Sequence, residues 1–152
     1  MNMNRAVPFV PFEKAKKILS GYAEIELAYL FGSAARGGLQ RESDIDIGIL
    51  LQRDFDAESA FSLRLELMNQ LQKIFERATE VVILNKAPLL LQYEAIKYHK
   101  PIYVKDERVR LSYESKVRRM YFDFRLILKR HSKNFLERLL KGGLLGAIRR
   151  SK

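Results

Sequence analysis

The chain has 152 residues, of which 47% are hydrophobic, and it contains no cysteine. This length suffices for one buried core, and the lack of cysteine excludes structural disulfides and cysteine-ligated metals. The net charge of +10 is uneven, because residues 1–104 hold 13 Lys and Arg against 13 Asp and Glu, whereas residues 105–152 hold 15 against 5. No apolar run approaches the roughly 20 residues that cross a bilayer, so we expect no membrane span and no signal peptide.

Apolar periodicity and capping residues predict helices and strands that alternate along the first two thirds of the chain. In order, we expect a helix over 12–20 and strands over 26–31 and 45–51. A helix capped by Asp54 or Asp56 then reaches about Phe75, and a strand over 80–84 follows it. The last elements are a helix capped by Asn85, with Pro88 in its first turn, and a strand over 101–104. This order predicts a single domain that contains both helices and strands.

A segment rich in Gly, Ala, Ser and Arg connects the first two strands and has the chemistry of a phosphate-binding turn. Gly32 has no Cβ, so phosphate oxygens can approach its backbone closely. The hydroxyl of Ser33 and the neighbouring N–H groups can donate hydrogen bonds to those oxygens. The guanidinium of Arg36 adds a fork of donors that matches a phosphate.

A pair of carboxylates, Asp44 and Asp46, opens the second strand. Because side chains alternate along a strand, the two carboxylates lie on one side, about 7 Å apart at the backbone. Their repulsion raises the pKa of one of them, and a divalent cation such as Mg²⁺ removes the conflict. Either motif alone is common in turns and strand edges, but the glycine turn and the acid pair together predict a site for a metal and a nucleotide.

The Gly32-Ser33 pair, the ten-residue spacer and Asp44-Ile-Asp46 resemble the signature of the DNA polymerase β-like nucleotidyltransferase superfamily. More narrowly, the segments 31–37 and 43–47 are similar to the minimal nucleotidyltransferases (MNT), which are encoded beside HEPN-domain proteins. This resemblance implies an α+β fold, with a small mixed sheet flanked by helices. It also implies a nucleotidyltransferase core over residues 1–105 and a basic helical extension of the same domain over residues 106–152.

The resemblance implies a third carboxylate on the next strand, and in this register it is Glu80, where the family usually has Asp. Under this interpretation Asp44, Asp46 and Glu80 are catalytic and bind one or two Mg²⁺ ions. Gly32, Ser33 and Arg36 then bind the phosphates of the substrate ATP. The alternative for Glu80 is a charged residue that simply opens a strand.

The resemblance to MNT antitoxins further implies a cytoplasmic antitoxin of a type VII toxin–antitoxin system. Such a protein adenylyltransferase moves AMP from ATP to a tyrosine hydroxyl of a cognate HEPN ribonuclease toxin and thereby neutralises the toxin. Two other functions stay open at this point. One is a small-molecule nucleotidyltransferase of the aminoglycoside type, whose cationic substrates the net charge of +10 disfavours. The other is an antitoxin that binds its toxin without catalysis.

The basic last third predicts a long helix over about residues 108–141, with a break near Ser132 as an option. Apolar residues lie along one side and arginines and lysines elsewhere. The helix either packs on its own domain with a solvated basic face, or docks a partner protein, or lies on an anionic membrane, or binds nucleic acid. Of these partners we expect no membrane, and nucleic acid is possible but not favoured. The aromatic cluster over residues 121–124 indicates a second covered surface, most simply covered by another protein.

Overall fold

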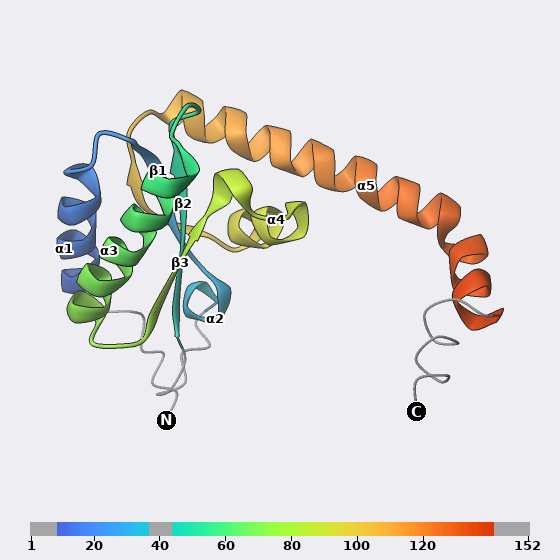
Figure 1. The fold of residues 1–152 in the computed structure, drawn as a ribbon, viewed down its shortest axis with the longest axis horizontal. Coiled ribbons are helices and arrows are strands. Elements are labelled where there is room, and N and C mark those ends of the chain that lie inside the picture. Colours follow the sequence, from blue (N-terminus) through green and yellow to red (C-terminus); the bar gives the residue numbers. More distant parts are fainter. Residues whose placement is uncertain (1–8, 37–43, 142–152) are drawn as a thin grey trace. The chain divides into compact units, whose positions relative to one another are not determined.

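The computed structural model describes residues 9–36 and 44–141. Contacts between residues divide the chain into two compact units, Met1–Val117 and Arg118–Lys152. The first unit holds the sheet and the helices that cover it (Figure 1). The predicted α+β class is confirmed for this unit.

The sheet of the first unit has four strands in the order β3-β2-β1-β4. The strands are β1 (Ile25–Phe31), β2 (Ile45–Leu51), β3 (Thr79–Ile83) and β4 (Lys100–Val104). The central strand β1 is antiparallel to both β2 and β4, and β2 is parallel to β3. The parallel pair requires a crossover connection, which helix α3 (Ala57–Phe75) provides. The sheet is therefore mixed, as the resemblance implied.

One face of the sheet is covered by α1 (Phe9–Ser20) and α3. Alternate residues of β2 enter this core, namely Ile45, Ile47 and Ile49, as the two-residue period of a strand requires. From α3, residues at helical spacing, such as Leu63, Leu67 and Leu71, pack against them. Burial of these apolar side chains is the main force that holds the two layers together.

The other face is covered by α4 (Leu89–Lys97) and by the first turns of α5 (Glu107–Lys141). Tyr29 and Phe31 of β1 pack there with residues of both helices. Asp46 is the strand partner of Phe31, and directly paired residues point to the same side of a sheet. Asp46 therefore faces the α4 layer, at the end of β1 where the chain turns into the short helix α2 (Gly32–Ala35).

Of the two predicted helix caps, the one before α3 is found in the structure and the one before α4 is not. Asp56 rather than Asp54 caps α3, because its Oδ1 accepts a hydrogen bond of 2.9 Å from the backbone N–H of Ser59. The predicted cap at Asn85 is wrong, since Asn85 lies in a 3₁₀ turn, η1 (Leu84–Lys86), and Pro88 is the N-cap of α4. The Asn85 side chain instead exchanges two 2.8 Å hydrogen bonds with the backbone N–H and C=O of Leu51.

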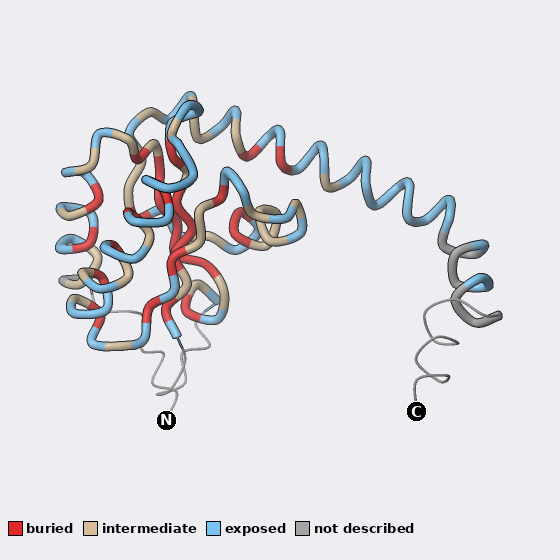
Figure 2. The backbone as a smooth tube through the Cα atoms, viewed as in Figure 1, coloured by how far each residue is buried: buried red, intermediate tan, exposed pale blue. Residues whose placement is uncertain are grey.

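The second unit contains the part of α5 that follows Val117. The helix continues through Ser132 to Lys141, so the optional break there is not observed. Residues 118–131 are exposed except Tyr121, which is half-buried (Figure 2). Within residues 9–36 and 44–141, no helix combines the length and the apolar character that a membrane span requires.

Candidate active site

The turn that follows β1 lies directly against the carboxylate of Asp46. Gly32 has a φ of +69°, a conformation that residues with a Cβ rarely adopt. A Cβ placed on Gly32 would overlap Oδ2 of Asp46. Because only glycine fits both the backbone angle and this contact, the predicted phosphate-binding turn and the predicted acidic strand are brought together here.

The three predicted carboxylates lie at the same end of the neighbouring strands β2 and β3. Asp46 is paired with Glu80 in the parallel register of β2 and β3, and Asp44 immediately precedes β2. Asp46 is half-buried, whereas Asp44 and Glu80 are exposed. Burial, then the charge of Glu80 and then that of Asp44 raise the pKa of Asp46. The three side chains thus form one electrostatic group, and a bound cation would relieve their repulsion.

No three His, Asp or Glu side chains within the described ranges are grouped closely enough to form a ready metal cage. The donor set is nevertheless of the right kind, because Mg²⁺ prefers oxygen ligands and usually combines one or two carboxylates with waters and substrate phosphates. When triphosphate oxygens complete the coordination of the Mg²⁺ ion, two carboxylates from the protein suffice and no third protein ligand is needed. Asp44 and Asp46 fit this requirement, with Glu80 at the neighbouring strand position.

Glu80 also has a basic neighbour at the outer edge of the sheet. Nη2 of Arg64, from α3, lies 4.0 Å from Oε1 of Glu80. Nε of Arg64 donates a 2.7 Å hydrogen bond to the backbone C=O of Val81, which fixes the guanidinium beside the strand. The ion pair is long and partly solvated, so it contributes little to stability and leaves Glu80 able to turn toward Asp46.

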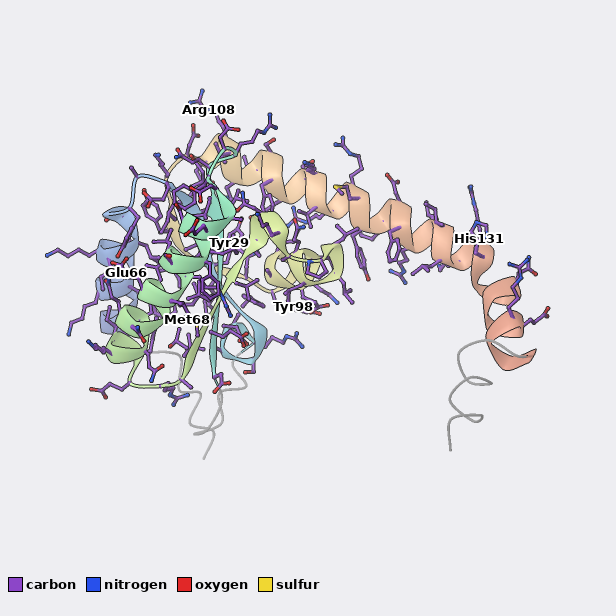
Figure 3. All side chains as sticks on the ribbon, in the orientation of Figure 1. Tyr29, Glu66, Met68, Tyr98, Arg108 and His131 are labelled. Atoms are coloured by element: carbon purple, nitrogen blue, oxygen red, sulfur yellow. The ribbon has the colours of Figure 1, made fainter. Side chains whose placement is uncertain are left out.

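Arg36 follows α2 and contacts two residues of the layer that α4 forms on the sheet. Its Nη2 lies 3.3 Å from Oε2 of Glu94, and its guanidinium lies over the ring of Tyr98, 5.1 Å from the ring centre. Tyr98, labelled in Figure 3, follows α4, which carries Glu94. Sequence reasoning missed both partners, because the pairing joins segments that are distant along the chain. Ser33, on α2, is exposed.

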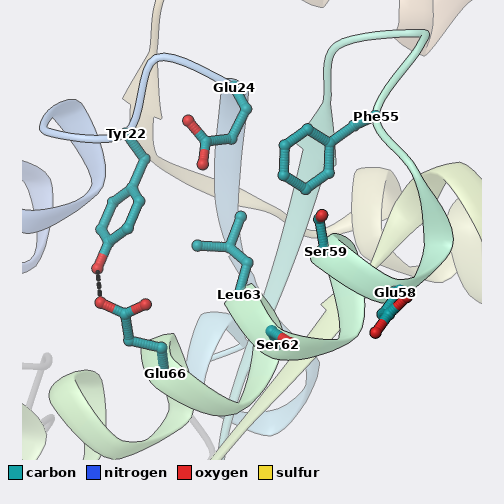
Figure 4. Close-up of a pocket in the computed structure, with 8 residues that line it drawn as sticks. All are labelled: Tyr22, Glu24, Phe55, Glu58, Ser59, Ser62, Leu63 and Glu66. Atoms are coloured by element: carbon teal, nitrogen blue, oxygen red, sulfur yellow. Dashed lines mark hydrogen bonds between the residues drawn. The ribbon is translucent and has the colours of Figure 1, made fainter.

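A shallow pocket of about 370 Å³ lies at the opposite end of the sheet from these residues. Figure 4 shows its lining, which comes from the loop before β1, the segment after β2 and the first half of α3: Tyr22, Glu24, Phe55, Glu58, Ser59, Ser62, Leu63 and Glu66. None of the predicted site residues belongs to it. The hydroxyl of Tyr22 donates a 2.6 Å hydrogen bond to Glu66 there, and these contacts brace the loop before β1 against α3.

A mixed sheet with a glycine turn packed against strand carboxylates places the chain in the class of nucleotidyltransferases. Residues 13–108 match the family profile described as "Polymerase beta, Nucleotidyltransferase", and the chain belongs to that family. A curated protein of Methanocaldococcus jannaschii, provisionally named a protein adenylyltransferase, is 39% identical over 69 residues, which are 45% of this chain and 67% of that protein.

Solved structures with the same fold come from toxin–antitoxin complexes. A chain of a toxin–antitoxin complex with AMP-PNP has a TM-score of 0.65 at 22% identity, covering 83% of this chain and 96% of that chain. A chain of the complex between tri-AMPylated Shewanella oneidensis HEPN toxin and MNT antitoxin has a TM-score of 0.63 at 21% identity, with the same coverage. At this identity the likeness concerns the fold.

Proposed function

We propose that the chain is the antitoxin of a type VII toxin–antitoxin system. In this proposal it is a Mg²⁺-dependent protein adenylyltransferase that moves AMP from ATP to a tyrosine hydroxyl of a cognate HEPN toxin. The observation that carries the proposal is the packing of the Gly32 turn against Asp46, beside Glu80. The name of the archaeal relative and the AMPylated toxin in a structural neighbour support the substrate class.

The roles of the residues follow from their positions. Asp44 and Asp46, with Glu80 beside them, would hold one or two Mg²⁺ ions. When bound, these ions offset the charge of the triphosphate and orient its α-phosphorus for in-line attack. The backbone at Gly32, the hydroxyl of Ser33 and the guanidinium of Arg36 bind the phosphates. Glu94 and Tyr98 hold Arg36 near that position before ATP arrives.

The transfer itself exchanges one bond to the α-phosphorus for another. The tyrosine oxygen of the partner attacks the α-phosphorus, and the bond from that phosphorus to the bridging oxygen of the β-phosphate breaks. Pyrophosphate leaves, and Glu80 accepts the proton of the tyrosine hydroxyl. A half-exposed carboxylate at an open sheet edge, as Glu80 is, can approach a hydroxyl presented by another protein. The proposal places this chemistry in the cytoplasm, where ATP is available.

The proposal is tested by incubating the purified chain with a cognate HEPN toxin, ATP and Mg²⁺. We expect mass spectrometry to find AMP on a tyrosine of the HEPN protein and the ribonuclease activity of that protein to fall. An aminoglycoside in place of the HEPN protein tests the small-molecule alternative. Neutralisation of the ribonuclease without any AMP on the HEPN protein would contradict the enzyme and favour the non-catalytic antitoxin.

A further inference from the structure

A stretch of α5 in the second unit carries large apolar side chains that the protein does not bury. Met120, Phe124 and Ile127 are 44%, 48% and 53% exposed. Isolated exposed apolar residues are ordinary on protein surfaces, but three on one side of a single helix form a continuous patch. We call these three residues the α5 seam.

The spacing of the seam is that of a helix-packing interface. Met120, Phe124 and Ile127 are separated by steps of four and three residues, which place them on one side of the helix. Tyr113 and Val117 continue the same steps toward the start of α5, and in the first unit both pack in the core with residues of the sheet and α4. The same spacing of apolar residues therefore continues from the first unit, where these residues are packed, into residues 118–131, where the seam residues are exposed.

The charge of the helix around the seam favours one kind of binding partner over another. Residues 118–130 hold five basic side chains against one acidic one: Arg118, Arg119, Arg125, Lys129 and Arg130 against Asp123. A second copy of the chain would bring the same positive charge to the interface, which costs free energy. A partner with acidic residues around an apolar face is attracted by the same charges, which also accelerate its association.

We propose that the α5 seam is the docking surface for the HEPN toxin, and that it packs lengthwise against an apolar helical face of that protein with acidic residues at the rim. This inference rests on the proposed function, because that function supplies the partner. The seam binds the substrate protein while the carboxylates of the first unit modify it, so binding and catalysis are carried by different residues.

The chain offers a matched control for the test. Phe122 and Leu126 are 48% and 53% exposed, as are Phe124 and Ile127, yet helical spacing places them away from the seam. The seam variant Phe124→Ser/Ile127→Ser and the control variant Phe122→Ser/Leu126→Ser lose similar exposed apolar surface and similar helix propensity. Circular dichroism and binding of ATP report whether each variant is folded.

We expect the seam variant to bind the HEPN protein at least about tenfold more weakly in calorimetry and the control variant to stay within about twofold of the unchanged chain. ATP binding is expected to be equal in all three proteins. Equal affinity of both variants for the HEPN protein would overturn the inference. It would also be overturned if the unchanged chain bound phosphatidylglycerol vesicles or itself through the seam and did not bind the HEPN protein.

The two proposals fail in different ways. If the unchanged chain binds the HEPN protein through the seam but transfers no AMP, the docking inference holds and the proposed function fails. If AMP is transferred and the seam variant binds and transfers normally, the proposed function holds and the docking inference fails.

Discussion

Gly32 and Asp46 are in direct contact, at the point where β1 ends and β2 begins its antiparallel run beside it. In the proposed site, the contact joins the residue that would give a phosphate access to the backbone with one of the carboxylates that would hold a cation. Because Asp46 is also the strand partner of Glu80, one short segment of sheet combines the turn and two carboxylates. The sheet therefore acts as a rigid support for the proposed chemistry.

Replacing Gly32 by Ala is expected to damage both the fold and the site. The methyl group would displace the Asp46 carboxylate, and the positive φ adds about 1–2 kcal/mol of strain. We expect a lower melting temperature and a loss of AMP transfer that exceeds the loss of folded protein. Gly21→Ala, at the turn after α1, serves as the control and is expected to transfer AMP normally. Normal transfer by the Gly32 variant would show that the contact is dispensable.

Asp46→Asn and Asp44→Asn are expected to lower AMP transfer by at least about a hundredfold, because each removes a charge that holds Mg²⁺. Both variants should fold, since Asn keeps the size of Asp and neither position lies in the apolar core. Steady-state transfer rates and thermal melts check this prediction. Transfer within a few-fold of the unchanged chain in either variant would exclude the proposed metal ligands.

The raised pKa of Asp46 predicts a pH dependence of stability in the absence of Mg²⁺. The folded protein binds this proton more tightly than the unfolded chain does, so the free energy of unfolding falls as pH rises from the ordinary to the raised pKa. Asp46→Asn removes this contribution, and the variant should be the more stable protein above that interval. Urea unfolding across the pH range measures the difference. Added Mg²⁺ should stabilise only the unchanged chain.

The site and the sheet were predictable from sequence to different degrees. The alternation of Ile45, Ile47 and Ile49 with Asp44 and Asp46 is local information, so strand and carboxylate placement followed from it. The prediction for Asn85 was wrong because its side chain bonds to the backbone of Leu51 on β2, a contact between distant segments that no local rule reveals. The contacts of Arg36 with Glu94 and Tyr98 likewise join segments that are distant along the chain, and only the folded chain shows them.

Substitutions of Glu80 are expected to lower catalysis much more than nucleotide binding. Glu80→Gln removes the base and should abolish transfer while Mg²⁺-dependent ATP binding partly survives, and Glu80→Asp should keep some activity. Stability should hardly change, because the ion pair with Arg64 is long and solvated. Single-turnover transfer and ATP titration measure the two effects. Unchanged turnover in the Gln variant would leave Glu80 as a charged residue that opens a strand.

Glu114 anchors the first turns of α5 to the sheet through a buried polar network that sequence patterns did not reveal. Its side chain is 4% exposed. Oε1 accepts hydrogen bonds from the hydroxyl of Tyr29 at 2.7 Å and from Nη1 of Arg110 at 3.1 Å, and Nε2 of His99 lies 3.2 Å away. Burial alone would raise the pKa of Glu114, but the hydrogen bond from Tyr29, the charge of His99 and Arg110 lower it below its ordinary value.

A lowered pKa means that the ionised carboxylate contributes stability above the ordinary pKa of a Glu, and that this contribution is lost as pH falls through the lowered value. Glu114→Ala leaves the hydroxyl of Tyr29 without its buried acceptor, whereas Arg110 keeps its ion pair with Glu107, and the variant should lose about 1–3 kcal/mol of stability at neutral pH. Glu114→Gln keeps the shape and should cost less. Its difference from the unchanged chain should shrink at acid pH, where Glu114 is itself neutral. Urea unfolding at neutral and acid pH measures the stability of both variants. If the Gln variant lost the same free energy of unfolding at every pH, the charge of Glu114 would contribute nothing to stability.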